Sequence, residues 1–366
     1  MKRILFFADA SSVHTQRWVR ECATRGFDCV VATRRPSPVP GAREVIAVRP
    51  GGDGGGWLTA LPEVRRVARR TQPVWVHGHY VTSYGLWAAA SATATRAPLV
   101  LTAWGSDILI TPRAPGWRGT TMRALVGWSL RHADLITADS HDVLAEIGSY
   151  RVRARCEEVL WGVDPELFRP GTPAPGFEVV SLRNWEPNYN IDTLLRAWAR
   201  LLGERSLDNP ALHLLGGGPD EGPLRSLASS LGIERTVHFV GRVDEAGMVQ
   251  ALQRSRVSVS VPSSDATSVS MLESMACALP VVASDLPANR QWVEADSGLI
   301  VPARDERALA QTLLRLHDNP KGALEIGARN REQVMQRASR RAQFDRMALL
   351  YEQLVATRPG RVPVNP

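Results

Sequence analysis

Long hydrophobic runs are absent from this sequence of 366 residues. No stretch approaches the roughly 18 consecutive apolar residues that a membrane-spanning helix requires. The first residues, MKRILFFADASS, lack a cleavable signal pattern, and we interpret RILFFA as a first buried strand. We therefore expect a cytoplasmic protein without Sec-type export, either free or peripherally attached to the inner face of the cell membrane.

Cysteines and clustered metal ligands are also scarce. The four cysteines (Cys22, Cys29, Cys156 and Cys277) form no Cys-Xaa-Xaa-Cys pair, and the histidines do not cluster at metal-ligand spacing. The sequence has no Asp-Xaa-Asp motif. We expect reduced cysteines in the core, no metal ion and no other cofactor.

Lysine occurs only at Lys2 and Lys321, so arginine supplies nearly all of the positive charge. The net charge is +7, and the excess lies in the first 165 residues, which contain 21 Lys and Arg against 14 Asp and Glu. One group of arginines crowds a predicted helix: Arg65, Arg66, Arg69 and Arg70. A second group is interleaved with Trp117, Leu125, Trp128 and Leu130: Arg113, Arg118, Arg123 and Arg131. Such basic faces are typical of helices that are exposed to solvent and cover a stripe of core residues. Alternatively, they could bind anionic lipid or a phosphorylated acceptor. No recognition motif accompanies the charge, so we expect no nucleic-acid partner.

Strand-like runs alternate with helical segments through both halves of the chain. The predicted strands are residues 4–8, 29–32, 74–77, 99–102 and 135–138, then 177–181, 211–215, 237–240, 257–261 and 281–283. This alternation predicts an α/β fold of two Rossmann-like, doubly wound parallel-sheet domains that face each other across a cleft. The linker LFRPGTPAPG separates them, which gives an N-terminal domain (1–168), a C-terminal domain (169–345) and a last helix with a tail (346–366).

The most informative segment is PSSDATSVSMLESMACALPVVASD, residues 262–285. A β-branched strand ends at Pro262, small residues form a turn, and an apolar helix face then begins. The free N–H groups at the start of such a helix suit a diphosphate. Asp265 and Glu273 place two carboxylates in this unit, which can contact hydroxyls at two points of one ligand. The alternative interpretation is that Asp265 caps the helix and that Glu273 is a helix residue exposed to solvent.

This segment resembles the signature of family 4 glycosyltransferases, retaining enzymes of the GT-B fold. The resemblance implies that Asp265 contacts sugar hydroxyls, that Glu273 contacts the ribose, and that the last helix crosses back to the first domain. The family's aromatic and glycine turn positions are replaced here by Ala266, Thr267 and Ser268, which precede Val269 at the helix start. The donor sugar is therefore expected to be selected at this turn.

Further donor-side residues follow the other strands of the second domain. Arg183 comes just after a strand, where a permanent positive charge can stabilise a departing diphosphate. The family pairs it with a lysine at the position of Tyr189, which either contacts the ligand or packs under Trp185. The family's glycine loops match Gly217 in LLGGGPDEGPL and Gly241 with Arg242 in VHFVGRV.

Acceptor-side candidates follow strands of the first domain. They are His14, His79, Trp104 and Asp107. We place His77 in the core and His79 at the cleft, and Trp104, often histidine in the family, either stacks on a sugar or is buried. Gly162 and Asp164, in the family's hinge motif, are interpreted as architectural, and GGDGGG, residues 51–56, as a loop near the acceptor.

The expected function is transfer of a sugar from a nucleotide diphosphate sugar to a hydroxyl acceptor, with retention. A UDP-sugar is preferred because UDP is the commoner nucleotide in the family, and a GDP-sugar is the second choice. The acceptor is expected to be a glycan, lipid-linked or at the cell surface, with contact to an anionic membrane. Two alternatives stay open: a nucleotide-sugar epimerase of the same architecture, and a catalytically weak nucleotide-binding partner subunit of a glycosyltransferase.

Overall fold

The computed structural model describes residues 2–49, 56–294 and 297–356, and the chain divides into two compact units. The first unit comprises residues 1–161 and 341–366, and the second comprises residues 162–340. Most of the predicted glycine-rich loop (residues 51–55) and the tail after Ala356 lie outside the described residues.

The divisions lie after Trp161 and after Arg340, and not at the boundaries of 168 and 345 that the sequence predicted. The segments around Val163 and Ser339 pair with each other, so both belong to the second unit. Val163 forms a parallel β-bridge with Ser339, and its N–H donates to Ala338 O at 2.8 Å. Arg340 N–H returns to Val163 O at 2.9 Å. Gly162 has φ +65°, and a Cβ there would lie 2.5 Å from the Cα of Arg340, so the hinge motif is architectural as predicted.

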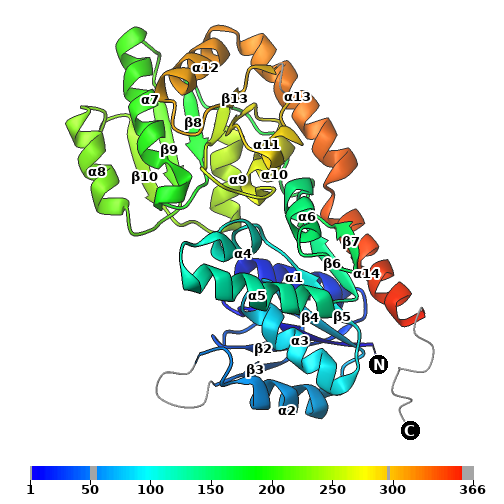
Figure 1. The fold of residues 1–366 in the computed structure, drawn as a ribbon. Helices are drawn as coiled ribbons and strands as arrows, with labels where there is room; N and C mark the ends of the chain where they lie inside the picture. Colours follow the sequence, from blue (N-terminus) through cyan, green and yellow to red (C-terminus); the bar gives the residue numbers. More distant parts are fainter. Residues whose placement is uncertain (1, 50–55, 295–296, 357–366) are drawn as a thin grey trace. The chain divides into compact units, whose positions relative to one another are not determined.

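Within the described residues, the first unit has a parallel sheet of seven strands in the order β3-β2-β1-β4-β5-β6-β7 (Figure 1). The strands are β1 (Arg3–Phe7), β2 (Asp28–Thr33), β3 (Ala42–Ala47), β4 (Trp75–His79), β5 (Leu99–Thr102), β6 (Leu135–Ala138) and β7 (Arg155–Glu158). Its helices are α1 (Val13–Thr24), α2 (Leu61–Thr71), α3 (Tyr84–Thr95), α4 (Ser106–Leu109), η1 (Thr111–Arg113), α5 (Trp117–His132), α6 (His141–Gly148) and α14 (Arg340–Ala356).

The described part of the second unit has six parallel strands in the order β10-β9-β8-β11-β12-β13. The strands are β8 (Glu178–Ser181), β9 (Ala211–Leu215), β10 (Val237–Gly241), β11 (Val257–Ser260), β12 (Val281–Ser284) and β13 (Ile300–Val301). The helical segments are η2 (Pro187–Tyr189), α7 (Ile191–Glu204), α8 (Glu221–Ser230), α9 (Glu245–Arg254), α10 (Val269–Ala276), α11 (Pro287–Arg290), α12 (Glu306–Asp318) and α13 (Pro320–Arg337). The prediction of two parallel-sheet α/β units is confirmed.

The central strands are recognisable in the sequence because they are buried on both faces. Every residue of β2, β4, β5, β6, β8, β11 and β12 is buried. The sequence-based prediction missed β3, β7 and β13. The outer strands β3 and β7 contain no buried residue, and β13 has only two residues, so none of the three leaves a continuous apolar run.

Helix α14 is anchored in the first unit by aromatic residues. Trp75 Nε1 donates to Tyr351 O at 2.7 Å, and the Tyr351 hydroxyl lies 2.6 Å from His77 Nδ1. Phe344 packs edge-on against Trp18, with ring centroids 4.9 Å apart. These contacts make the last helix part of the first unit's core.

Across residues 2–49, 56–294 and 297–356, no helix combines the length and the apolar character that crossing a bilayer requires.

Candidate functional site

The predicted donor-side residues gather at the carboxyl edge of the second sheet, where β8 and β11 are neighbours. Strand order reverses between these two strands, and open α/β sheets bind ligands at such a switch point. Arg183 follows β8, and the turn formed by residues 263–268 follows β11. The topology therefore brings these two segments together.

Arg183 is held by three side chains and is only 8% exposed. Its Nη1 donates to Ser268 Oγ at 2.6 Å and to Ser270 Oγ at 3.4 Å. Its Nη2 forms an ion pair with Asp265 Oδ2 at 2.6 Å. Its Nε is buried and has no hydrogen-bond partner among the described residues. The guanidinium is thus a fixed positive charge with one unsatisfied donor, which an anionic ligand can satisfy.

The N-terminus of α10 adds backbone donors beside this charge. Ser268 is the N-cap residue, and its Oγ accepts the Met271 N–H at 3.3 Å. Since the same hydroxyl accepts from Arg183, the arginine is fixed directly to the start of the helix. Val269 is the first residue of α10. A helix N-terminus and an arginine in contact suit a phosphate or diphosphate.

The turn before α10 is fixed by its own contacts. Asp265 Oδ1 accepts the Ala266 N–H at 3.1 Å, while Oδ2 pairs with Arg183. Ala266 and Thr267 are buried, and Thr267 Oγ1 accepts from Trp292 Nε1 at 3.3 Å. The Asp265 side chain keeps 23% of its surface exposed. A contact between Asp265 and hydroxyls of a ligand stays a prediction.

Glu273 lies one helical turn after Val269 on α10 and is 2% exposed. The next residue, Ser274, shares a hydrogen bond of 2.8 Å with Ser258 of β11, which fixes the helix on the sheet. A ribose contact by Glu273 stays a prediction.

Tyr189 contacts Arg183 rather than standing free in its loop. The guanidinium carbon of Arg183 lies 4.4 Å from the centre of the Tyr189 ring, a cation–π arrangement. Burial raises the pKa of the Tyr189 hydroxyl, and the neighbouring Arg183 opposes that shift. Tyr189 thus packs on the Arg183 guanidinium, and a direct contact between Tyr189 and a ligand stays a prediction.

The glycine loops pack against the segment that carries Arg183. Trp185 N–H donates to Gly217 O at 3.1 Å, and Gly216 N–H donates to Gly241 O at 2.9 Å. A Cβ on Gly216 would lie 2.3 Å from Arg183 O, so that position excludes any side chain. A Cβ on Gly217 would lie 3.2 Å from Nε of the exposed Arg242. Gly241 has φ +83°, which favours glycine.

Two residues that help to build this site, Asn188 and Asn190, were missed from the sequence. Asn188 Nδ2 donates to Ser264 O at 2.9 Å, and Asn190 Nδ2 donates to Val261 O at 2.8 Å. The asparagines clamp the turn after β11, and an Asn before a helix in the loop RNWEPNYN was the available signal.

The first unit has a polar pocket of about 610 Å³ at the carboxyl edge of its sheet. Strand order reverses between β1 and β4, and residues after both strands line the pocket. Its lining includes Asp9, Ser12, Arg34, Arg35, Trp57, Tyr80, Thr82, Ser83, Tyr84, Ser106, Asp107 and Thr111. Asp107 is the only one of the four acceptor-side predictions in this lining. Arg34 and Arg35 directly follow β2. They were missed because no sequence motif marks them.

His14 and Trp104 belong to an aromatic cluster rather than to that pocket lining. Trp104 stacks on Trp161 with ring centroids 3.8 Å apart, and His14 lies 4.6 Å from Trp161. Trp104 is half-buried, and His14 is exposed on α1. One face of Trp104 packs on Trp161 while part of the indole reaches solvent, and stacking of Trp104 on a sugar stays a prediction.

His79 is 1% exposed, so the expectation that it faces a cleft while His77 faces the core was wrong. Residues two apart on a strand point to the same face, and the two imidazoles lie 4.8 Å apart. His77 is buried as predicted and bonds to Tyr351 and Thr102. His79 Nε2 has no hydrogen-bond partner among the described residues, and burial lowers the pKa of His79 to about 3. Almost no surface of His79 is open to an acceptor.

Asp107 fixes loops at the pocket wall. Its Oδ2 accepts the Val81 N–H at 2.7 Å, and its Oδ1 accepts the Trp104 N–H at 2.9 Å. The residue is 2% exposed, and burial raises its pKa to about 6, against the lowering effect of these backbone bonds. Both oxygens are committed to the backbone, so Asp107 positions the segments after β4 and β5.

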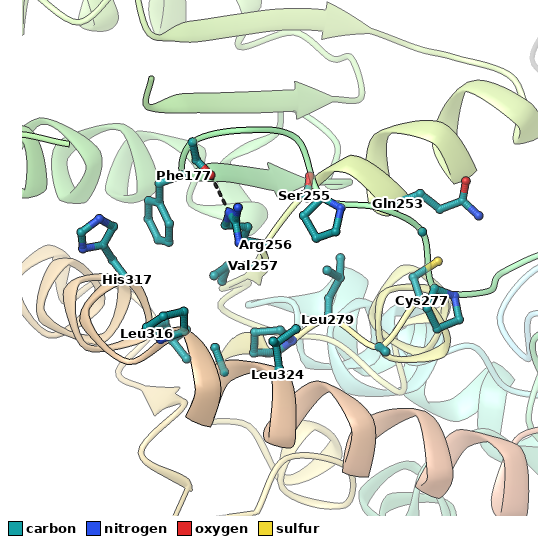
Figure 2. Close-up of a pocket in the computed structure, with 18 of the residues that line it drawn as sticks. Phe177, Gln253, Ser255, Arg256, Val257, Cys277, Leu279, Leu316, His317 and Leu324 are labelled. Atoms are coloured by element: carbon teal, nitrogen blue, oxygen red, sulfur yellow. Dashed lines mark hydrogen bonds between the residues drawn. The ribbon is translucent and has the colours of Figure 1, made fainter. Parts of the chain in front are cut away.

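A pocket of about 410 Å³ lies at the opposite, amino edge of the second sheet (Figure 2). Phe177, Val257, Leu279 and Leu324 supply apolar walls, and Arg256 Nε donates to Gly176 O at 2.5 Å. Because its lining includes Phe177, Arg256 and Pro280, which directly precede β8, β11 and β12, this pocket is separate from the Arg183 site.

Among the described residues, no group of three or more His, Cys, Asp or Glu side chains has an arrangement that could hold a metal ion. The expected independence of metals and other cofactors stays a prediction.

Two family models match in tandem, one on each unit. A model described as "Glycosyl transferase 4-like" matches residues 3–140, and one described as "Glycosyl transferases group 1" matches residues 177–319. The phosphatidyl-myo-inositol mannosyltransferase of Mycobacterium leprae is 35% identical over 153 residues, covering 41% of this chain and 39% of the relative. The N-acetyl-alpha-D-glucosaminyl L-malate synthase of Bacillus anthracis is 21% identical over 291 residues, covering 76% and 74%. Four curated relatives, among them the mycobacterial protein, are 30–35% identical to this chain, and the chain spans no more than half of the length of each.

Solved structures share the fold of both units. Anabaena Alr3699/HepE in complex with UDP-glucose superposes with a TM-score of 0.81 at 17% identity, covering 96% of this chain and 99% of that one. At this identity the likeness establishes the fold, which is the GT-B arrangement expected from the sequence.

Proposed function

Because the chain belongs to the GT4-like glycosyltransferases of the GT-B fold, we propose that it transfers a sugar with retention from a nucleotide diphosphate sugar to a hydroxyl acceptor. The observation that supports this most directly is the buried Arg183, held between Asp265 and the N-terminus of α10. A fixed cation beside helix N–H groups suits the charge that develops on a departing diphosphate.

In the proposed reaction, the acceptor hydroxyl attacks the anomeric carbon on the face that the nucleotide leaves. The bond between that carbon and the diphosphate oxygen breaks, and its electron pair stays on the diphosphate. The acceptor proton passes to the departing oxygen, so no protein nucleophile is required. Arg183 and the amides at Val269 and Ser270 stabilise the negative charge of the leaving group.

The proposed donor contacts divide between two carboxylates. Glu273 binds the ribose hydroxyls, and the turn at Asp265 reads the sugar, with Thr267 and Ser268 shaping its wall. A UDP-sugar is the first choice and a GDP-sugar the second. Support for UDP comes from the structural relative Anabaena Alr3699/HepE, which is described in complex with UDP-glucose.

The proposed acceptor side is the polar pocket of the first unit. Arg34 and Arg35 supply positive charge, since the Arg35 guanidinium is 75% exposed and lies 3.7 Å from Asp9. Thr82 and Ser83 supply hydroxyl partners. This chemistry suits an acceptor with an anionic group, such as a lipid-linked or cell-surface glycan. Replacing Arg34 with Gln should raise the KM for such an acceptor while leaving donor affinity unchanged.

A panel of UDP-, GDP- and ADP-sugars tests the proposal, with thermal shift reporting binding and nucleotide release reporting turnover. One donor should raise the melting temperature and release its nucleoside diphosphate, faster with acceptor present. The epimerase alternative has no support in the comparisons, and donor alone returned as an isomerised sugar would contradict the proposal. Tight nucleotide binding without hydrolysis or transfer over a broad acceptor panel would instead favour a catalytically weak partner subunit.

A further inference from the structure

The segment from Ile110 to the start of α5 presents two large apolar side chains to solvent. Trp117, the first residue of α5, is 74% exposed, and Ile110, between α4 and η1, is 45% exposed. We call these residues together with Arg113, Arg118 and Arg123 the α5 tip. Large apolar side chains held in water on adjoining elements indicate a surface that another phase or molecule covers.

The α5 tip is also strongly basic. Residues 108–133 contain four arginines and no Asp or Glu. Arg113 and Arg123 share one carboxylate, that of Glu146, at 2.6 and 3.5 Å. The guanidinium of Arg118 lies 5.6 Å from the centre of the Trp117 ring. Three arginines against one carboxylate leave an excess of two positive charges beside the exposed indole.

A tight turn fixes the position of Trp117. Gly116 has φ +80°, a conformation that favours glycine. A Cβ on Gly119 would lie 1.8 Å from Ala114 O, so the first turn of α5 packs directly on the preceding loop. The indole is therefore displayed from an ordered backbone rather than from a free loop.

We propose that the α5 tip docks on an anionic lipid surface. Trp117 and Ile110 enter the interfacial layer, where an indole is favoured between headgroups and acyl chains. Arg118, Arg113 and Arg123 contact lipid phosphates, and each arginine near an anionic bilayer increases partitioning about fivefold. The charge selects an anionic membrane over a neutral one, and the apolar side chains distinguish a bilayer from a free phosphate.

The tip adjoins the polar pocket of the first unit. Ser106 and Thr111 line that pocket, and Ile110 lies next to Thr111 in the chain. A docked tip therefore holds the pocket wall at the lipid headgroups, which suits a lipid-linked acceptor. This last step rests on the proposed function, whereas docking itself does not.

Helix α2 provides a matched control within the same unit. Arg65, Arg66, Arg69 and Arg70 are exposed on it, but its apolar residues Val64, Val67 and Ala68 are buried beneath. The α2 face thus has charge without exposed apolar side chains on the helix itself. A variant with Arg65→Gln and Arg69→Gln removes two charges from α2 and leaves the tip intact.

The full chain is sedimented with vesicles of 30% phosphatidylglycerol in phosphatidylcholine and with vesicles of phosphatidylcholine alone. Wild type should bind the anionic vesicles at least tenfold better. The double variant Ile110→Ser, Trp117→Ser should lose at least tenfold in binding, and Arg118→Gln about fivefold. The α2 variant should lose less than threefold, and donor hydrolysis should be unchanged in the tip variants.

Two results would overturn the proposal. One is wild-type binding that does not distinguish the two vesicle compositions. The other is a loss with the α2 variant as large as with the tip variants, which would mean diffuse electrostatic attraction. Because all substituted side chains are exposed, unchanged melting temperatures should show that the variants remain folded. Failure of vesicle binding with normal donor turnover would remove the docking surface and leave the enzyme function standing.

Discussion

Arg183 and Asp265 form an ion pair, 2.6 Å between Nη2 and Oδ2, that ties the loop after β8 to the turn after β11. The arginine side chain is 9% exposed and the aspartate 23%. The pair joins two segments at the topological switch point, so it both fixes the turn and sets the orientation of the cation. Asp265 thus has a structural role in addition to the proposed contact with the sugar.

Replacing Asp265 with Asn should lower the free energy of unfolding by about 1–3 kcal/mol, because a charge-assisted hydrogen bond in a partly buried site is lost. It should also slow turnover of the sugar nucleotide while leaving the affinity for the free nucleoside diphosphate within about threefold. Urea unfolding and calorimetric titration measure the two effects. Asp285→Asn, which breaks the exposed pair with Arg290, is the control and should cost under about 0.5 kcal/mol. Equal losses in the two variants would contradict the assigned role.

Replacing Glu273 with Gln should weaken binding of a nucleoside diphosphate by about tenfold or more, because a charged acceptor for the ribose hydroxyls is lost. Inorganic pyrophosphate has no ribose, so its affinity should not change. Isothermal titration measures both ligands, with the exposed Glu325→Gln on α13 as control. If pyrophosphate and nucleotide weakened in parallel, Glu273 would be acting on the diphosphate or on the fold.

Replacing Ala278 with Gly should stabilise the protein by about 0.5–1 kcal/mol. Ala278 follows the C-cap of α10 with φ +58°, and its neighbours form a Schellman pattern: Ala278 N–H bonds Met275 O, and Leu279 N–H bonds Ser274 O. A left-handed conformation strains alanine and not glycine, which outweighs the greater freedom of glycine in the unfolded chain. Thermal unfolding measures the change. Ala276→Gly, within α10, should shift stability in the opposite direction, and a loss in both variants would contradict the strain at Ala278.

Acid should destabilise the protein through His79. Burial lowers the pKa of its imidazole from 6.5 to about 3, so the unfolded chain binds a proton between these pH values and the native state does not. Stability from this group is complete above pH 6.5 and falls by about 1.4 kcal/mol per pH unit below it. Between about pH 6 and 4, His79→Leu should therefore reduce the slope of the free energy of unfolding against pH by about 1.4 kcal/mol per pH unit, which corresponds to about one bound proton. Parallel curves for the two proteins would mean that His79 already titrates in the native state.

The sequence was sufficient for the features that depend on buried strands and on the residues directly after them. β8 and β11 are Val-rich, and since residues after adjacent parallel strands meet at one edge, Arg183 and the Asp265 turn were placed together correctly. The cation–π contact of Tyr189 was not predictable, because it depends on how two loops pack. Arg34 and Arg35 were likewise missed, since the strand before them gives no sign of which side chains line a pocket.

The error at His79 came from strand geometry. A period of two places His77 and His79 on one face, and both are buried in the aromatic cluster around Trp18. Trp161, which the sequence marks only as part of the hinge motif, stacks on Trp104 in that cluster. Sequence patterns identify core segments, but contacts between residues far apart in the chain require the folded structure.

The most direct test of the leaving-group role is the turnover rate of Arg183→Ala with the best sugar nucleotide. Loss of the fixed cation should lower kcat by about a hundredfold or more. Arg183→Lys should retain part of the rate, and Arg200→Ala, at an exposed pair with Glu306, should match wild type. Circular dichroism and melting temperature establish that each variant is folded. A folded Arg183→Ala protein that turns over donor at the wild-type rate would contradict the account.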